Sequence, residues 1–236
     1  MGCCSICASE GLGFPSATSL DPLYQADSMF VDPYSLELET YANELLDSAP
    51  WTLAADLPHV VIKTLPGSKF CAQSPVVCLD LLFGDKVDVA VVEALLLNPD
   101  ARKIWDTRLS DFYQLEESPR SVYYTLVGFP FPFKNRDFVE IVTTRKHRNG
   151  TSIVMYSSDD HSFASRHERG TTHFTVVQIR PDARTRIVAQ FDLKLVIHQK
   201  LVGKYLVKVL DGWTKSLVQT ALLNSKQEGT DRAVRC

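Results

Sequence analysis

The sequence has no apolar run that approaches the ~20 residues of a membrane-spanning helix. It also has no excess of one charge, because 25 lysines and arginines stand against 28 aspartates and glutamates, giving a formal net charge of −3. Without a basic excess there is no global field that attracts nucleic acid, so nucleic acid is not an expected partner. Hydrophobic residues still make up 45% of the 236 residues, which is enough for a sizeable core.

Cysteine is scarce, and its spacing fits neither a disulfide framework nor a structural zinc site. The six cysteines are Cys3, Cys4, Cys7, Cys71, Cys78 and Cys236. They contain one Cys-x-x-Cys pair, and the six histidines show no metal-binding spacing, so we expect no metal and no other cofactor. The chain also lacks a basic segment followed by a short apolar signal core, so we expect a reducing, cytoplasmic setting.

The first residues, MGCCSIC, are similar to an acylation signal. Gly2 would supply the amine for a myristoyl group, although the usual pattern has Ser or Thr at the position where Ile6 stands. Cys3 and Cys4 would offer thiols for palmitate, and two acyl chains anchor a protein stably where one does so only marginally. The alternative is that residues 1–33, rich in Ser, Gly, Pro and Ala, form a flexible tail with incidental cysteines. Both interpretations remain open.

The rest of the chain alternates helical and strand patterns. A helix is predicted to open at Ser35, whose side chain would cap it. A longer helical pattern over 86–106 is interrupted at Asn98-Pro99, which predicts two helices in place of one. Asn149-Gly150 is a strong hairpin signal, so the later strands are predicted to form an antiparallel meander. The predicted strands are 51–56, 59–65, 75–83, 111–117, 121–129, 137–147, 151–158, 171–180 and 185–197.

The last predicted strand and the last predicted helix have the clearest periodicity. In the strand, apolar residues from Ile187 to Ile197 alternate with a polar face that contains Gln190 and Lys194, which predicts one buried face and one face in water. The segment 199–226 is predicted to be one amphipathic helix, with apolar positions mostly every fourth residue. Its apolar stripe is wide and requires a concave partner. Residues 227–236 are predicted to form a loose tail.

Between two strands, the segment GFPFPFKNRD places two prolines before a charged cluster. The prolines hold the chain extended at this point. Arg136 and Asp137 are predicted to bond the backbone of the turn and each other. The cluster would then anchor the turn and touch no ligand.

Three segments, in this order, resemble the START domain, the lipid-transfer domain related to steroidogenic acute regulatory protein. NPDARKIWD (98–106) resembles the family's short helix that ends in Trp-Asp. SVYYTLVGFPFPFKNRDFVEIV (121–142) is similar to its Tyr-rich strand, Pro-rich elbow and Arg-Asp-Phe-Val strand, and RIVAQFDLKL (186–195) is similar to its last strand. The resemblance covers about residues 35–225 and implies a START-like domain over 34–226.

The resemblance implies an α+β fold of the helix-grip type, in which a curved antiparallel sheet wraps around a long carboxy-terminal helix. Such a domain shields one lipid, a phospholipid or a sterol, in a cavity between sheet and helix, without catalysis. Lys200, Lys204 and Lys208 would face a membrane surface near the gate of the cavity. The residues expected to line the lipid cavity are Trp105, Tyr124, Phe138, Glu140, Val142, Phe191, Leu206, Leu210 and Trp213.

The strand that begins at the elbow departs from the family pattern. Many family members carry a basic residue where Val142 stands. Glu140 shares a strand face with Val142, and a buried carboxylate requires a partner or a raised pKa. Arg145 and Arg166 are the candidate partners. Plain alternation also allows the opposite arrangement, with Val139 inside and Glu140 in water.

From these features we expect an intracellular monomer that binds or transfers one lipid and associates with a membrane surface. The alternative is a membrane-tethered adaptor that senses a lipid and changes its protein contacts without net transfer. A fixed acyl anchor favours the adaptor, because a tethered carrier cannot diffuse between distant membranes. An enzyme would need several titratable groups converging in the cavity, and the sequence offers only Glu140, so we expect no enzyme.

Overall fold

The computed structural model describes residues 32–83, 87–115, 118–129, 133–158, 167–182, 184–194 and 199–234. The predicted acylation sites Gly2, Cys3 and Cys4 and the candidate Arg166 lie outside these residues. The helices are α1 (Pro33–Ser48), α2 (Val89–Leu97), α3 (Pro99–Trp105) and α4 (Gln199–Val234). The strands are β1 (Thr52–Leu57), β2 (Val60–Leu65), β3 (Val76–Leu81), β4 (Leu109–Leu115), β5 (Ser118–Leu126), β6 (Arg136–His147), β7 (Gly150–Ser157), β8 (Glu168–Arg169), β9 (Thr171–Ile179) and β10 (Thr185–Asp192).

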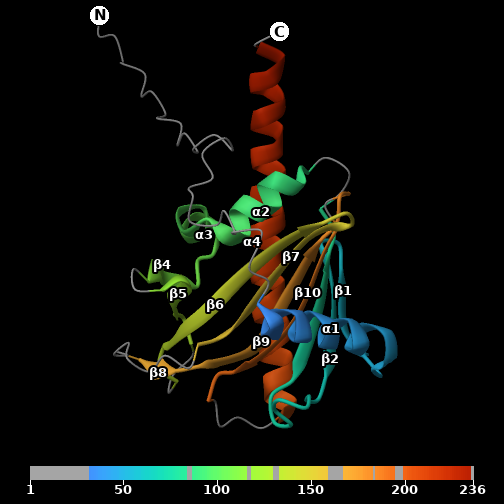
Figure 1. The fold of residues 1–236 in the computed structure, drawn as a ribbon, viewed down its shortest axis with the longest axis vertical. Coiled ribbons are helices and arrows are strands. Elements are labelled where there is room, and N and C mark those ends of the chain that lie inside the picture. Colours follow the sequence, from blue (N-terminus) through green and yellow to red (C-terminus); the bar gives the residue numbers. More distant parts are fainter. Residues whose placement is uncertain are drawn as a thin grey trace, which may run out of the picture.

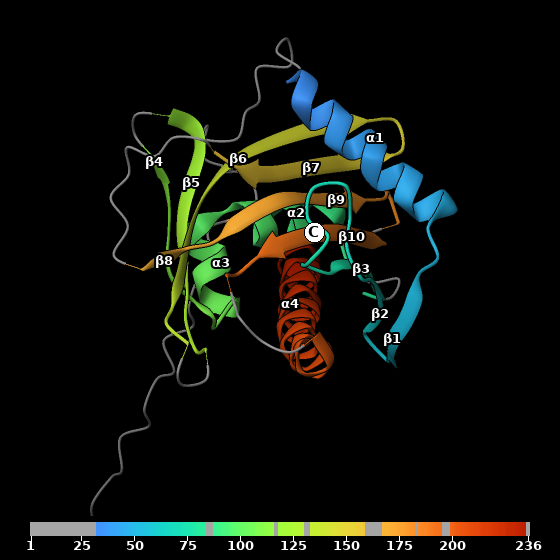
Figure 2. The same cartoon turned by 90° about the horizontal axis from the view of Figure 1, so that it is seen from below.

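The described strands form one sheet with the order β1-β2-β3-β10-β9-β7-β6-β5-β4, and β8 pairs with β6 beside this path. Neighbouring strands of the path are antiparallel, whereas β8 is parallel to β6. The predicted meander is confirmed for the later strands, and the pairing of β3 with β10 joins the first three strands to it. The sheet curves around α4, from β4 and β5 at one edge to β1 at the other (Figure 2).

The hairpin between β6 and β7 fixes the register of two long central strands. His147 pairs with Gly150 across the turn that Asn149-Gly150 predicted. Gly150 has φ +128°, and a Cβ atom there would lie 1.9 Å from the carbonyl oxygen of Ile179. A larger residue would therefore collide with the backbone of β9.

The sheet is covered on both faces. α4 lies across the concave face and α1 crosses the outer face (Figure 1 and Figure 2). The inner core joins α2, α4 and the sheet and includes Leu95, Leu217 and Ala221. The outer core lies between α1 and the sheet and includes Leu38 and Phe174. The predicted α+β arrangement, a curved antiparallel sheet around a long terminal helix, is confirmed.

The polar face of β10 is not in water, contrary to the prediction from alternation. Gln190 is fully buried, and its amide nitrogen donates to the backbone oxygens of Cys71, at 2.7 Å, and Ser74, at 2.6 Å. The hydroxyl of Ser68 donates to its amide oxygen. The loop between β2 and β3 is thus folded over the outer face of the sheet, which the period of a single strand cannot reveal.

Asn98 explains why one helical pattern gives two helices. It ends α2 and caps α3, where its side-chain oxygen accepts from the backbone N–H groups of Asp100, at 2.9 Å, and Ala101, at 3.1 Å. Pro99 begins α3 and has no N–H with which to continue the hydrogen bonds of α2. The predicted break is confirmed.

Two helix ends differ from the prediction. Asp32, not Ser35, caps α1, and its carboxylate accepts from the backbone N–H of Tyr34 at 3.1 Å. Pro33 occupies the first turn, where its missing N–H would have no helical partner. At the other end of the chain, α4 continues to Val234, so part of the predicted loose tail is helical.

Arg136 anchors the end of the sheet, as predicted, but through other partners. Its guanidinium is buried, donates from Nε to the backbone oxygen of Leu193 at 2.6 Å, and pairs with Glu168 at 3.0 Å. Asp137 pairs with Arg169 at 2.8 Å rather than with Arg136. The cause is β8, which runs beside the start of β6 and brings Glu168 and Arg169 to these two residues.

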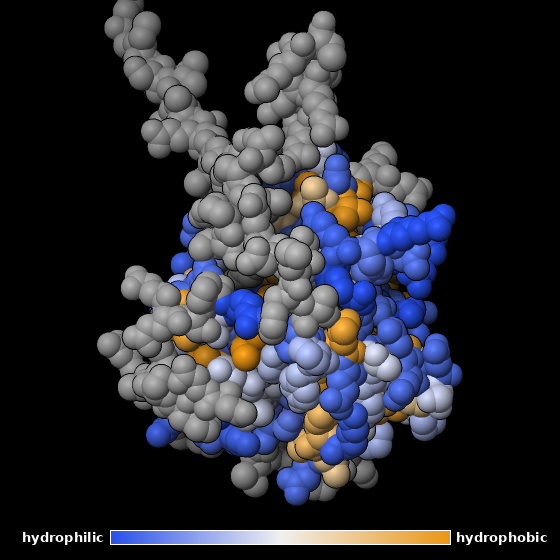
Figure 3. Space-filling model, in the orientation of Figure 1, coloured by the Kyte–Doolittle hydropathy of each residue, from blue (hydrophilic) through white to orange (hydrophobic). Residues whose placement is uncertain are grey.

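The described surface seen in Figure 3 is mostly hydrophilic, with small separate hydrophobic patches. Among the described residues, no helix combines the length and apolarity that crossing a bilayer requires. The apolar surface that matters for the site lies inside, between the sheet and α4.

Candidate functional site

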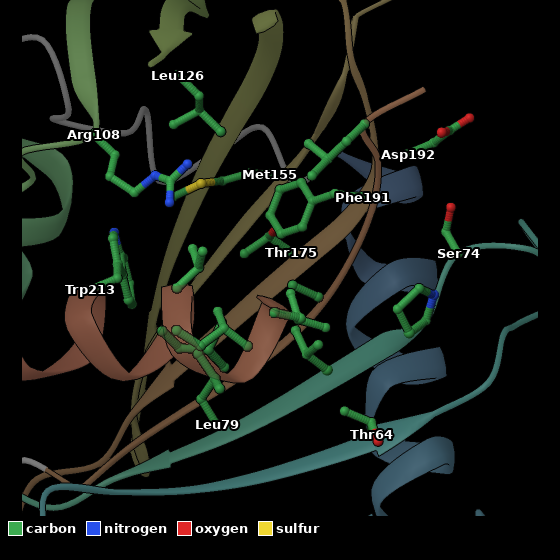
Figure 4. A pocket seen from close by; sticks show the side chains of 18 of the residues that line it. Thr64, Ser74, Leu79, Arg108, Leu126, Met155, Thr175, Phe191, Asp192 and Trp213 are labelled. Atoms are coloured by element: carbon green, nitrogen blue, oxygen red, sulfur yellow. The ribbon is translucent and has the colours of Figure 1, made fainter. Parts of the chain in front are cut away.

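A cavity of about 640 Å³ lies between the concave face of the sheet and α4. Strands β1, β2, β3, β5, β6, β7, β9 and β10 contribute to one side, and residues 205–213 of α4 contribute to the other. Side chains from both sides converge on this space (Figure 4). Most of its surface is apolar, and the main apolar residues of the wall are Leu79, Met155, Val177, Ile187, Ala189, Leu206, Val209 and Leu210.

The periodicities seen in the sequence place these side chains. Tyr205, Val209 and Trp213 stand four residues apart on α4 and line the cavity. Leu217 and Ala221 continue the same stripe into the core. On β10, as the alternation predicted, Ile187, Ala189 and Phe191 line the cavity, and so does Leu193 directly after the strand.

The structure divides the predicted cavity residues into a wall and a supporting layer. The residues in the wall are Tyr124, Glu140, Phe191, Leu206, Leu210 and Trp213. Trp105 is behind the wall because its indole N–H donates to a backbone oxygen of α2 at 2.8 Å, and its ring packs against Trp213, with centroids 5.2 Å apart. Phe138 stacks against Tyr124, with centroids 4.8 Å apart. Val142 is buried in the inner core. These three residues support the wall without forming it.

The predicted membrane-facing lysines belong to α4. Lys200 and Lys204 lie in its first turns, at positions whose side chains are outside the described set, and Lys208 is exposed. Their membrane-facing role stays a prediction. In the part of the chain that the structure describes, no group of three or more His, Cys, Asp or Glu side chains could hold a metal ion.

Glu140 lies on the cavity wall and is 2% exposed. Its carboxylate accepts hydrogen bonds from the hydroxyl of Tyr124, at 2.6 Å, and from that of Thr172. Burial raises the pKa of Glu140, and the two hydrogen bonds and the charge of Arg102 oppose this rise only in part. The inward placement implied by the family resemblance is correct, and the alternative with Val139 inside in place of Glu140 is wrong.

Arg145, the one proposed arginine partner of Glu140 that the structure describes, does not lie beside it. Arg145 pairs with Glu39 of α1 at 2.5 Å. Positions 140 and 145 are five apart along the strand, an odd offset, so their side chains lie on opposite faces of β6. Arg166 is outside the described residues. Hydroxyl groups therefore hold this carboxylate.

Replacing Glu140 with glutamine is expected to stabilise the protein, and the gain is expected to grow with pH. Folding raises the pKa of Glu140, so the protonated carboxyl contributes its full stabilisation below the unfolded-state pKa of about 4.3. This stabilisation is lost as the pH rises through the folded-state pKa. Glutamine keeps an acceptor for Tyr124 but does not titrate. We expect a gain of about 1 kcal/mol, or about 2–4 °C in Tm, near pH 8. Thermal unfolding of both proteins between about pH 4 and 8 measures it.

Two further variants control this experiment. Glu37→Gln changes an exposed carboxylate of α1 and is expected to alter stability by less than about 0.5 kcal/mol. Glu140→Leu removes the acceptor of the buried Tyr124 hydroxyl and is expected to cost about 1–3 kcal/mol. If the difference in thermal stability between Glu140→Gln and the original protein does not change with pH, the raised pKa of Glu140 is contradicted.

Charged side chains from α3 and the turn after it form one end of the cavity. Asp106 is 2% exposed, and its Oδ2 accepts from the indole N–H of Trp213 at 2.8 Å and lies 3.7 Å from Nε of Arg102. Its Oδ1 accepts from the backbone N–H of Arg108 at 3.3 Å. The Arg108 side chain extends into the cavity, where its Nη2 donates to the hydroxyl of Tyr205 at 3.4 Å (Figure 4). Three charged side chains therefore gather at this end of the cavity, whose walls are largely apolar.

The sequence prediction missed these charged residues and Thr175. Thr175 is buried and lines the cavity, and within the described part of the chain its hydroxyl has no hydrogen-bond partner. Alternation along β9 could have identified it, because Val177 faces the cavity from the same side of the strand. Arg102, Asp106 and Arg108 lie in a short helix and a turn, where no period indicates which side chains face a cavity.

The whole fold aligns with solved structures. Human STARD10 aligns with a TM-score of 0.68 and 16% identity, covering 89% of this chain and 87% of that one. Human StAR-related lipid transfer protein 5 aligns with a TM-score of 0.65 and 15% identity, covering 80% of this chain and 96% of that one. This chain has the START-domain fold. A STAR-related lipid transfer protein from Xanthomonas axonopodis aligns less closely, with a TM-score of 0.53 and 18% identity over 72% of this chain and 97% of that one.

No protein-family model matches this sequence, and no curated protein matches it. The TM-scores establish a shared START fold. Because the identities are low, the chemistry of the cavity is argued from this chain's own side chains. In this START fold the sheet and α4 enclose an apolar space that is charged at the α3 end. Such a space fits an amphiphile, whose apolar part would lie along the walls and whose polar group would lie at the charged end.

Proposed function

We propose that this protein binds one lipid between the sheet and α4 and transfers it between membranes in the cell. The apolar cavity of about 640 Å³ within a START fold is the observation that supports this function best. Moving an acyl chain or a sterol from water into such a cavity contributes about 25 cal/mol per Å² of buried apolar surface. That gain can offset removal of the lipid from a bilayer. Phospholipid and sterol, the classes implied by the sequence, are both test ligands.

In this proposal, residues 34–226 form the lipid-binding domain of a monomer that acts by binding rather than by catalysis. Acylation of Gly2 and of Cys3 or Cys4, which lie outside the described residues, would hold the protein on a membrane. A tethered protein could also act as an adaptor that senses a lipid without net transfer. The acylation-like sequence at the amino terminus is the observation that favours this second function.

Lipid exchange requires part of α4 to move. The part of α4 from Leu217 to Ala221 is held in place, because both of these residues are fully buried in the inner core. The cavity-lining half of α4, from Tyr205 to Trp213, is only half-buried, and Asp211 on this half pairs with His59 at 3.1 Å. We propose that this half, with the start of α4, opens and recloses over the lipid.

Two measurements on the full chain test the proposal. Mass spectrometry of the purified protein identifies any lipid that co-purifies with it. A transfer assay between two liposome populations, with fluorescent phospholipid or sterol in the donor, measures carriage. Transfer faster than the spontaneous rate supports the carrier, and a bound lipid without faster transfer favours the adaptor. Absence of both bound lipid and transfer would contradict lipid binding.

A further inference from the structure

The anionic side chains on the cavity wall already have protein partners. They are Asp106, Glu140 and Asp192. Asp106 accepts from the indole N–H of Trp213, and Glu140 accepts from two hydroxyl groups. Asp192 pairs with Lys194 at 2.7 Å. None of the three requires a ligand to satisfy its charge.

Of the two cations on the wall, Arg102 is compensated within the protein. Its Nε lies 3.7 Å from the buried carboxylate of Asp106, and its Nη1 donates to the backbone oxygen of Leu96 at 3.5 Å. Its guanidinium carbon also lies 5.1 Å from the ring centroid of Phe112. Arg102 and Asp106 thus form a charge-balanced pair at the end of the cavity.

Arg108 is different, because no carboxylate of the described residues lies within ion-pair distance of it. Its side chain contacts the hydroxyl of Tyr205, at 3.4 Å, and the ring of Phe129, whose centroid is 5.3 Å from the guanidinium carbon. Its backbone is held in place, since its N–H donates to Asp106 and its carbonyl accepts from the N–H of Val127 at 2.8 Å. A positioned cation with spare N–H donors therefore lines the cavity.

Tyr205 adds a second donor at the same point. Its hydroxyl oxygen accepts from Arg108, which leaves the hydroxyl proton free to donate to another acceptor. A guanidinium from the α3–β4 turn and a phenol from α4 thus meet at one place on the wall. This pair is complementary to an anionic group, because charge-assisted bonds from arginine to a carboxylate or phosphate are the strong ones.

The volume of the cavity limits the rest of the ligand. At about 30 Å³ for each water-sized group, 640 Å³ holds on the order of twenty such groups. A single long acyl chain with a small head is of this size. A phospholipid with two long acyl chains has far more heavy atoms and would require the cavity to expand.

We propose that the cavity selects a single-chain amphiphile with an anionic head, a carboxylate or a phosphate monoester, held by Arg108 and Tyr205. This inference rests on the proposed lipid-binding function and narrows its ligand class. The acyl chain lies along the apolar wall formed by residues such as Val177, Ile187 and Leu210. The head bridges the α3–β4 turn and α4.

Titration of the full chain with four 18-carbon ligands tests the inference. Oleate and oleoyl lysophosphatidate carry the anionic heads, whereas oleyl alcohol is neutral and oleoyl lysophosphatidylcholine is zwitterionic. Binding is followed by tryptophan fluorescence, because Trp213 lines the cavity. We expect at least one anionic ligand to bind about 10-fold or more tightly than oleyl alcohol, the gain of a charge-assisted hydrogen bond. The tighter of the two anionic ligands identifies the head as carboxylate or phosphate.

Arg108→Gln is expected to abolish this preference, because it lowers the affinity for the anionic ligands to about that for oleyl alcohol. Arg184→Gln, at an exposed site outside the cavity, is the matched control and is expected to keep the preference. The comparison of the four ligands on the original protein tests the inference even if Arg108→Gln does not fold. Equal affinity for anionic and neutral ligands, or a preference that survives Arg108→Gln, would overturn the inference and leave lipid binding intact. Failure to bind any of the four ligands, cholesterol or phosphatidylcholine would overturn both.

Discussion

Replacing Arg136 with methionine is expected to destabilise the protein by about 3–5 kcal/mol, because its buried guanidinium supplies the donors for two backbone oxygens. The side chain is 2% exposed, and it donates to the backbone oxygens of Leu193, at 2.6 Å, and Lys134, at 2.5 Å. Both bonds are partly buried, and an acceptor left there without its donor costs about 1–3 kcal/mol. Urea unfolding of the full chain, followed by tryptophan fluorescence, measures the change in the free energy of unfolding.

Arg184→Met is the matched control for this experiment. Arg184 is 72% exposed and pairs with Asp182 at 3.1 Å, so its loss is expected to change stability by less than about 1 kcal/mol. A similarly small effect of Arg136→Met would contradict the anchoring role of this arginine. Arg136 also matters for the cavity, because Leu193, whose backbone oxygen it holds, is part of the cavity wall.

The sequence predicts the elements of this fold well where one face of an element meets one core. The stripe of α4 and the alternation along β10 each identify the side that faces the inner core and the cavity. The prediction is wrong where a second layer covers the other face. Gln190 reads as a surface residue in the sequence, but the β2–β3 loop buries it. Such burial depends on contacts between segments that are distant in the sequence, and the periodicity of one strand does not reveal them.

The candidate site shows the same division. The family resemblance implies which face of a strand or helix points to the cavity. It placed Tyr124, Glu140 and Trp213 on that side, and all three are found in the wall. Arg108 follows a short helix in a turn, and only the fold brings its side chain to Tyr205 of α4. The partner of Glu140 was predicted to be an arginine because opposite charge is the simplest compensation. Among the described residues, the hydroxyl groups of Tyr124 and Thr172 bond this carboxylate, and burial raises its pKa.

Replacing Val209 with tryptophan is expected to weaken lipid binding by about 100-fold without loss of stability. Val209 lines the cavity from α4, between Tyr205 and Trp213 on the same stripe, so a larger side chain there projects into the cavity. If the indole displaces about four methylene groups of the ligand at about 0.8 kcal/mol each, binding loses about 3 kcal/mol, which corresponds to about 100-fold in Kd. Filling a cavity commonly stabilises a protein by about 0.5–2 kcal/mol, so Tm is expected to stay equal or rise.

Gln219→Trp places the same side chain on an exposed position of α4 and serves as the control. It is expected to keep both lipid binding and stability, which separates occlusion of the cavity from any general effect of an added tryptophan. The titration with oleate and the liposome transfer assay both report the result. If Val209→Trp folds normally and still binds and transfers lipid at the original rate, the ligand does not occupy the space between β10 and α4. A lipid seen to co-purify would then have to bind elsewhere on the molecule.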